Sequence, residues 1–183
     1  MKRNKRVVIS GSPGAGKTSI IECLSQKGYT TFEEYSRNLI EDAQRQGTPN
    51  FFLSDPILFS EKIFRGRQEQ FEAAKKLTKV KNDVLYYDRG IHDTLAYLRT
   101  IEQNLPWLEK EVLEFQYDLV FLVNPWEEIY KKDDQRIETF EQAKTYYPFI
   151  KKMYEKQHQV IELPQVSVSE RISFIESFVN DHG

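Results

Sequence analysis

An eight-residue segment near the N-terminus constrains this chain more than any other. It runs Gly11, Ser12, Pro13, Gly14, Ala15, Gly16, Lys17 and Thr18, and it fits the phosphate-binding pattern G-x-x-x-x-G-K-[ST] without a mismatch. Glycines let such a backbone curl so that its N–H groups surround an anion. Lys17 is then expected to reach the outer phosphates of a nucleotide, and the Thr18 hydroxyl to ligate Mg²⁺. Ser19 begins the next helix, whose positive N-terminal end faces the same anion.

The flanking sequence supports this interpretation. Residues 6–10 form a short apolar run typical of a buried strand, and residues 19–24 have the pattern of a helix. Strand, loop and helix follow in the order that the motif requires. The alternative is a glycine-rich turn in which the Lys-Thr pair is accidental.

Length and charge bound the class of protein. The chain has 183 residues and 39% hydrophobic content, which predicts one globular domain over residues 1–183. Its net charge of −2 does not predict binding to nucleic acid. The chain has no apolar run long enough to cross a membrane, and the basic N-terminus lacks the apolar core of an export signal. With Cys23 as the only cysteine, we expect a cytoplasmic protein; the oligomeric state stays open.

Apolar runs alternate with helical patterns along the chain. Strands are predicted at 6–10, 29–32, 84–87, 119–123 and 159–163. Helices are predicted at 35–46, 57–79, 92–101 and 107–115, in a charged stretch over 126–157 broken by Pro148, and from the capping box at Ser167 onward; residues 48–56 are predicted to be a loop. This order predicts an α/β fold with a doubly wound, five-stranded parallel sheet. Ligands of such sheets bind at the carboxyl ends of the strands.

Charged residues follow two of the predicted strands. Asp88 ends the third strand, where phosphate-loop proteins hold Mg²⁺, and this role is favoured over the alternative of a helix N-cap. Arg89 is a candidate for clamping a phosphate, or else a partner in a structural ion pair. Glu34 follows the second strand and is a candidate general base; binding a substrate hydroxyl or the metal's water shell, or a surface role, are its alternatives.

Three further groups have weaker patterns. Residues 126–144 can form a lid that places Arg136 on the phosphates, or a solvated helix with ion pairs along its surface. Arg65 and Arg67 either contact an anionic group of an acceptor or lie on a solvated helix face, and the charge pattern favours the solvated face. His92 either lines the site or lies on a helix surface, and the surface position is favoured.

These motifs resemble the small P-loop AAA-domain family of predicted ATPases. That family is related to ribosylnicotinamide kinase domains and, more distantly, to nucleoside and nucleotide kinases. The resemblance covers nearly the whole chain and rests mainly on the phosphate loop and on Tyr87-Asp88-Arg89-Gly90, with Glu34-Tyr35-Ser36-Arg37, Arg67-Gln68, Asp93, Ala96, Tyr97, Asn124-Pro125-Trp126, Ile129-Tyr130, Asp134 and Arg136 in support. It implies a P-loop NTPase fold of the nucleoside-kinase type and binding of ATP with Mg²⁺. It also implies an acceptor near Glu34, Arg37 and Arg89, with Arg67 and Asp93 among the substrate-binding candidates.

Two classes of function fit these residues. The first is a kinase that transfers the γ-phosphoryl group of ATP to a small acceptor such as a nucleoside or nucleotide, with Lys17, Arg89 and Arg136 stabilising the transferring group. The second is a nucleotide-gated binding module with slow hydrolysis, for which Phe51 and Phe52 would supply an apolar contact surface. A motor ATPase usually has Glu directly after the metal-binding Asp, where this chain has Arg89, so the kinase is favoured.

Overall fold

A parallel five-stranded sheet forms the centre of the molecule. The structure is a computed structural model and describes residues 3–48, 50–130 and 139–182. The strands are β1 (Lys5–Gly11), β2 (Thr30–Phe32), β3 (Val84–Asp88), β4 (Leu119–Val123) and β5 (Val160–Leu163), in the spatial order β2-β3-β1-β4-β5. Every pair of neighbours is parallel, as the alternation of apolar runs and helices predicts.

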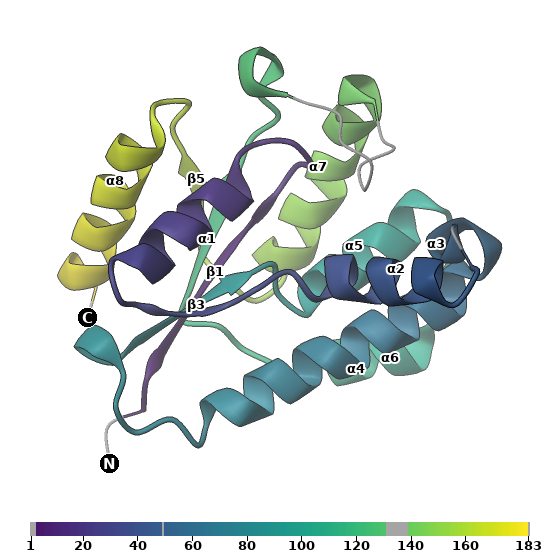
Figure 1. Ribbon diagram of the computed structural model, residues 1–183, viewed down its shortest axis with the longest axis horizontal. Helices are drawn as coiled ribbons and strands as arrows, with labels where there is room; N and C mark the ends of the chain where they lie inside the picture. The colour runs from purple at the N-terminus through teal and green to yellow at the C-terminus, as the bar shows by residue number, and fades with distance from the viewer. Residues whose placement is uncertain (1–2, 49, 131–138, 183) are drawn as a thin grey trace.

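Helices cover both faces of this sheet (Figure 1). On one face, α1 (Lys17–Gln26) and α8 (Val168–Asp181) bury Ile20, Leu24 and Ile175 against alternate strand residues such as Val7 and Ile9. The intervening strand residues point to the other face, which packs against α4 (Pro56–Ala74), α5 (His92–Thr100), α6 (Pro106–Val112) and α7 (Phe140–Glu155). Burial on both faces explains why β4 is an uninterrupted apolar run. The doubly wound fold is confirmed.

A smaller cluster lies beside the sheet. Helix α2 (Tyr35–Arg45) and the short helix α3 (Phe51–Ser54) pack on the N-terminal half of α4 around Phe51, Phe59 and Ile63. The prediction of a plain loop over residues 48–56 is therefore wrong. The carbonyl of Asn50 accepts hydrogen bonds from the Leu53 and Ser54 amides, which forms one helical turn, and Asp55 then caps α4 through the Leu58 amide.

Three other boundaries differ from the sequence prediction. Helix α4 ends at Ala74 instead of residue 79. Within the predicted charged helix over 126–157, residues 127–129 form a 3₁₀ turn, η2 (Glu127–Ile129), and α7 runs from Phe140 to Glu155. Pro148 lies inside α7 without ending it, because Ala143 and Ile150 on its two sides are both buried and hold the helix in place. Among the described residues, none of the helices is both long and apolar enough to cross a membrane.

Candidate active site

The phosphate loop connects β1 to α1 and has the curled backbone that its glycines predict. Gly11, Gly14 and Gly16 all have positive φ values, of 122°, 73° and 83°. A Cβ atom on Gly11 would lie 2.2 Å from the Val123 carbonyl oxygen of β4, so the loop can leave the sheet here only with glycine. The Ser12 amide donates to that same carbonyl oxygen at 3.1 Å, which fixes the first turn of the loop.

Lys17 folds back over this loop. Its Nζ donates to the carbonyl oxygens of Ser12, at 2.6 Å, and Gly11, at 3.2 Å. Burial, together with the nearby Arg89 guanidinium, lowers the pKa of Lys17 to about 7. These carbonyl oxygens are the partners that the ammonium group would exchange for phosphate oxygens.

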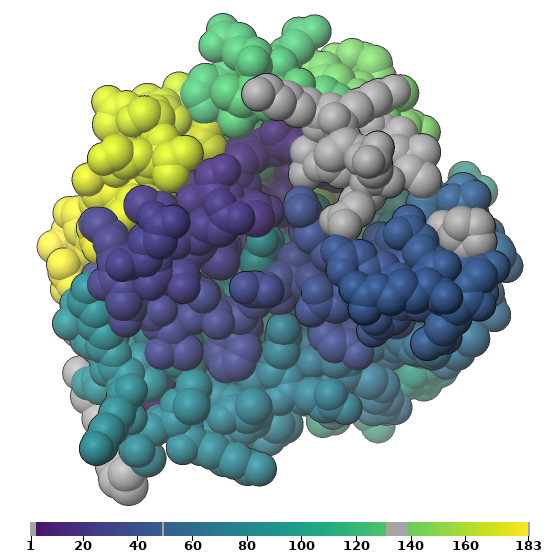
Figure 2. Space-filling model, viewed as in Figure 1, coloured from purple at the N-terminus to yellow at the C-terminus, as the bar shows by residue number. Residues whose placement is uncertain are grey.

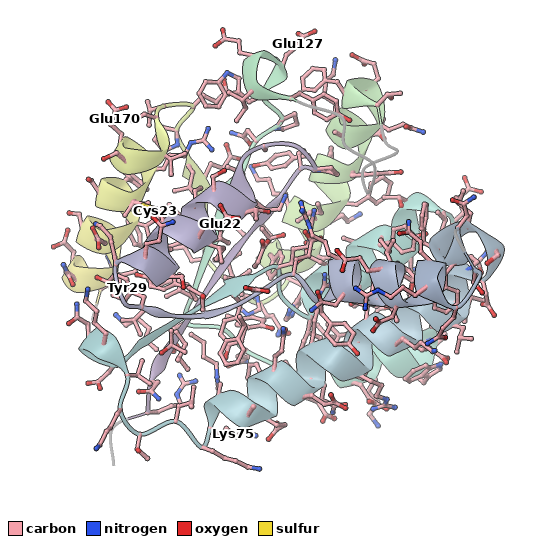
Figure 3. The ribbon with its side chains drawn as sticks, in the orientation of Figure 1. Glu22, Cys23, Tyr29, Lys75, Glu127 and Glu170 are labelled. Carbon is pink, nitrogen blue, oxygen red and sulfur yellow. The ribbon has the colours of Figure 1, made fainter. Side chains whose placement is uncertain are left out.

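Two side chains that the sequence analysis did not single out as functional support the loop from outside. Arg171 of α8 is buried; its Nη1 donates to the Ala15 carbonyl oxygen at 2.9 Å, and its guanidinium lies 4.7 Å from the centre of the Trp126 ring. The Tyr130 ring packs so closely on Gly14 that a Cβ atom there would lie 2.5 Å from it. Figure 3 shows the segment after β4 at Glu127 and the first turn of α8 at Glu170, the two elements that supply these contacts.

Asp88, at the end of β3, has the character of a cation ligand. Its side chain is buried, and its Oδ1 atom has no hydrogen-bond partner. Burial, with the Glu34 charge, raises the pKa of Asp88 to about 6. A buried carboxylate oxygen with no donor is costly unless a cation or proton meets it, so this residue fits the Mg²⁺ role that the sequence predicts. The described residues contain no cluster of three or more acidic, His or Cys ligands.

Glu34 joins two arginines at the neighbouring strand end. Its Oε1 accepts hydrogen bonds from Arg89 Nε at 2.8 Å and Ser36 Oγ at 2.8 Å, and its Oε2 accepts one from Arg37 Nε at 3.2 Å. Burial acts to raise the pKa of Glu34, but the charges of Arg89, Lys17 and Arg37 outweigh it and hold this pKa well below its usual range. The three residues that the resemblance associates with an acceptor are thus brought together.

Asp93 has protein partners on both carboxylate oxygens. Oδ1 accepts from Ser10 Oγ and from Arg89 Nη1, and Oδ2 accepts from the Gly90 amide and from Tyr154 Oη. Arg89 is therefore fixed between Glu34 and Asp93, with a left-handed backbone at φ 68°. Asp93 lines the cavity described below, but the contacts it makes are those of a side chain that orients Arg89.

Two sequence predictions about exposure are wrong. Arg67 is only 4% exposed, and its Nη1 donates to the Gly90 carbonyl oxygen at 3.1 Å and to Thr94 Oγ1 at 3.3 Å, whereas a solvated face was favoured for it. His92, expected on a helix surface, is 1% exposed and stacks on Tyr154 beneath the site. Arg65 does lie in solvent, where it pairs with Glu111.

One cavity of about 520 Å³ joins these groups. One end is formed by the phosphate loop and the start of α1, including Lys17, Thr18 and Ser19. The middle contains Glu34, Arg37 and Arg89, and the far end is lined by Phe52, Phe59 and Tyr97 with Arg67 beside them. Figure 2 shows the surface hollowed between the purple segment that carries the loop and the blue helices α2 and α3. Asp88 lies outside this lining, and Arg136 falls outside the described residues together with the rest of residues 131–138 of the predicted lid.

The parallel sheet, the phosphate loop and the acid at the end of β3 define the class: this is an α/β protein with a P-loop NTPase fold. A protein-family model described as "AAA domain" matches residues 6–171, and the chain belongs to that family. The resemblance predicted from the sequence is confirmed. No curated protein matches the sequence.

Solved structures with the same fold include three kinds of protein. A deoxyadenosine kinase from M. mycoides is 15% identical with a TM-score of 0.63, covering 96% of this chain and 99% of its own. A thymidylate kinase from Ehrlichia chaffeensis is 15% identical with a TM-score of 0.65, covering 97% and 100%. A NadR protein in complex with NR is 16% identical with a TM-score of 0.74, covering 98% of this chain and 51% of its own.

Proposed function

We propose that this protein transfers the γ-phosphoryl group of ATP to a small acceptor of the nucleoside or nucleotide type. The observation that supports this most is the single cavity that runs from the phosphate loop, past Arg89, to an aromatic end. A protein that only hydrolysed ATP would need no second compartment lined by Phe52, Phe59 and Tyr97. The kinase fold of the structural neighbours adds support of a general kind.

The residues divide between donor and acceptor. Residues Ser12 to Ser19 would bind the phosphates of ATP, with Lys17 at the outer phosphates. Thr18 and Asp88 would hold Mg²⁺, which supplies neutralising positive charge to the phosphates when bound. Arg89 and Arg37 would lie against the transferring group, in positions that Glu34 sets by pairing with both. The depressed pKa of Glu34 favours this orienting role over that of general base.

Acceptor-dependent turnover tests the proposal. Incubation with ATP, Mg²⁺ and a panel of nucleosides, nucleotides and sugars should yield ADP together with a phosphorylated acceptor, detected by mass spectrometry. Lys17→Ala should abolish the product, because removing the ammonium group that meets the developing charge typically costs about 10²-fold or more in turnover. Slow loss of ATP that no acceptor stimulates would instead support the nucleotide-gated module. The apolar contact surface suggested for that module is not supported, because Phe51 is buried and Phe52 lines the cavity.

A further inference from the structure

The acceptor half of the cavity carries more positive than negative charge. The guanidinium groups of Arg37, Arg67 and Arg89 all line it. Among the described residues, two carboxylates, Glu34 and Asp93, line the same region. Glu34 is shared between Arg37 and Arg89, and Asp93 makes its ion pair with Arg89, although the Arg67 charge also helps to lower the Asp93 pKa. Within the described part of the chain, the third guanidinium therefore makes no ion pair of its own.

Arg67 is that unpaired cation. Among the described residues, no carboxylate oxygen lies within ion-pair distance of it, and its two hydrogen bonds go to the neutral oxygens of Gly90 and Thr94. The side chain is 4% exposed, and its Nε atom has no hydrogen-bond partner. A buried charge is costly without a counter-ion, so this position is suited to an anion that arrives with a ligand.

Neither of the two carboxylates that line this region in the described part of the chain is free to take a proton from an acceptor hydroxyl. Both oxygens of Glu34 accept hydrogen bonds from guanidinium groups, and both oxygens of Asp93 accept from at least two donors each. An acceptor whose attacking oxygen is already ionised needs no such base. A phosphate monoester meets this condition near neutral pH, because its second pKa is about 6.

The far end of the cavity suits a flat, apolar group. Phe52, Phe59 and Tyr97 line it, and the Phe59 and Tyr97 rings lie 6.2 Å apart in an edge-to-face arrangement. The Tyr97 hydroxyl donates to the Phe52 backbone carbonyl oxygen at 3.0 Å, which ties the Tyr97 side chain to the backbone of α3. Aromatic side chains of this kind bind planar heterocycles by stacking or edge contacts.

We infer that the acceptor is a nucleoside monophosphate, bound with its phosphate on the Arg37, Arg67 and Arg89 side and its base among the three aromatic rings. This inference rests on the proposed function. A non-bridging oxygen of the acceptor phosphate attacks the γ-phosphorus of ATP, and the bond from that phosphorus to the bridging oxygen of ADP breaks. The products are ADP and a nucleoside diphosphate. The dianionic acceptor supplies the electron pair, so no proton has to be removed from it.

Calorimetry on the full chain tests the inference of a nucleoside monophosphate acceptor separately from the kinase proposal. A non-hydrolysable ATP analogue with Mg²⁺ is titrated first, followed by the 5′-monophosphates of adenosine, guanosine, cytidine, uridine and thymidine and by the matching nucleosides. We expect the analogue to bind, and at least one monophosphate to bind about tenfold or more tightly than its nucleoside. Binding of the analogue with no preference for any monophosphate overturns the inference and leaves the kinase proposal standing. Failure to bind the analogue overturns the proposed function itself.

Variants of one helix provide the matched control. Arg67→Met should weaken monophosphate binding about tenfold or more, while the affinity for the ATP analogue stays within about twofold. Arg65→Met is the control, because Arg65 lies two residues away, is exposed, pairs with Glu111 and lies outside the cavity lining. This variant should change neither the affinity for the monophosphate nor the affinity for the ATP analogue. Arg67→Lys keeps the positive charge, and its affinity for the monophosphate should lie between those of the wild type and Arg67→Met. Equal monophosphate affinity in all four proteins, with unchanged thermal midpoints, would contradict the inference.

Discussion

At the scale of single residues, Asp93 shows how a side chain that lines the cavity can serve mainly to hold other side chains. Its four donors come from three separate places: Ser10 on β1, Arg89 and the Gly90 amide after β3, and Tyr154 on α7. Gly90 permits this arrangement, because a Cβ atom there would lie 2.5 Å from the Tyr154 hydroxyl oxygen. The carboxylate therefore ties α7 to the arginine that faces the cavity.

Removing the Tyr154 hydroxyl tests that link. Tyr154→Phe keeps the ring but removes the 2.6 Å hydrogen bond to Asp93 Oδ2. Hydrogen bonds to charged groups contribute about 1.5–3 kcal/mol, so we expect the free energy of unfolding to fall by about 1–3 kcal/mol in urea titrations at pH 7.5. An unchanged urea midpoint would show that the other donors satisfy Asp93 fully without it.

At the scale of helices and strands, apolar periodicity was enough to predict most of the fold. All five strands and the capped start of α8 lie where the pattern indicated them. The pattern also held information that was not used: Arg67 lies three residues after Phe64 and four before Phe71, on the buried face of α4. Arg171 likewise adjoins Ile172 on the apolar face of α8. The charge of Arg67 suggested that its side chain lies in solvent, whereas its helical spacing from Phe64 and Phe71 indicated that it is buried.

The remaining parts of the site depend on contacts between segments that are distant in sequence. No local pattern shows that Tyr97 of α5 hydrogen-bonds to Phe52 of α3, or that Arg171 reaches the Ala15 carbonyl oxygen. The sequence thus predicted the end of the cavity at the phosphate loop, because one continuous loop forms it. It left the composition of the rest of the cavity open, because several helices that are distant in sequence each supply part of the lining.

The packing of α2 on α4 provides a test at this scale. Gly66 allows the Tyr35 ring to lie against α4, since a Cβ atom at Gly66 would lie 2.1 Å from that ring. Gly66→Ala should therefore displace Tyr35 and destabilise the protein by about 1–3 kcal/mol, measured by thermal or urea unfolding. Gly47→Ala is the control, because its Cβ would meet nothing within 4 Å and its cost comes from the φ of 83° alone. That cost is about 1 kcal/mol. A smaller loss at Gly66 than at Gly47 would contradict the packing argument.

At the scale of the whole molecule, buried histidines make stability depend on pH. Burial, with a contribution from His158, lowers the pKa of His92 from 6.5 to about 3. The folded protein therefore keeps His92 neutral, whereas the unfolded chain binds a proton below pH 6.5. Stability from this group is complete above that pH and is lost as the pH falls toward 3, by up to about 1.4 kcal/mol per pH unit.

Comparison with a variant isolates this effect, because Asp88 acts in the opposite direction. Its pKa of about 6 means that the folded state gains a proton before the unfolded state does as the pH falls. We expect His92→Phe to lose less unfolding free energy than the wild type between pH 6.5 and 5. The difference should be up to about 1.4 kcal/mol per pH unit, the contribution of one group that only the unfolded chain protonates, and urea titrations at several pH values measure it. Identical pH slopes for wild type and variant would show that His92 is protonated in the folded state as well.

The hydrogen bond from Arg171 to the Ala15 carbonyl oxygen joins residues that lie 156 positions apart in the sequence. During synthesis the turn between β1 and α1 therefore exists well before the guanidinium that supports it. Until residue 171 has been made and α8 has docked, the Ala15 carbonyl oxygen lacks this donor, so the loop reaches its final geometry only after α8 is in place.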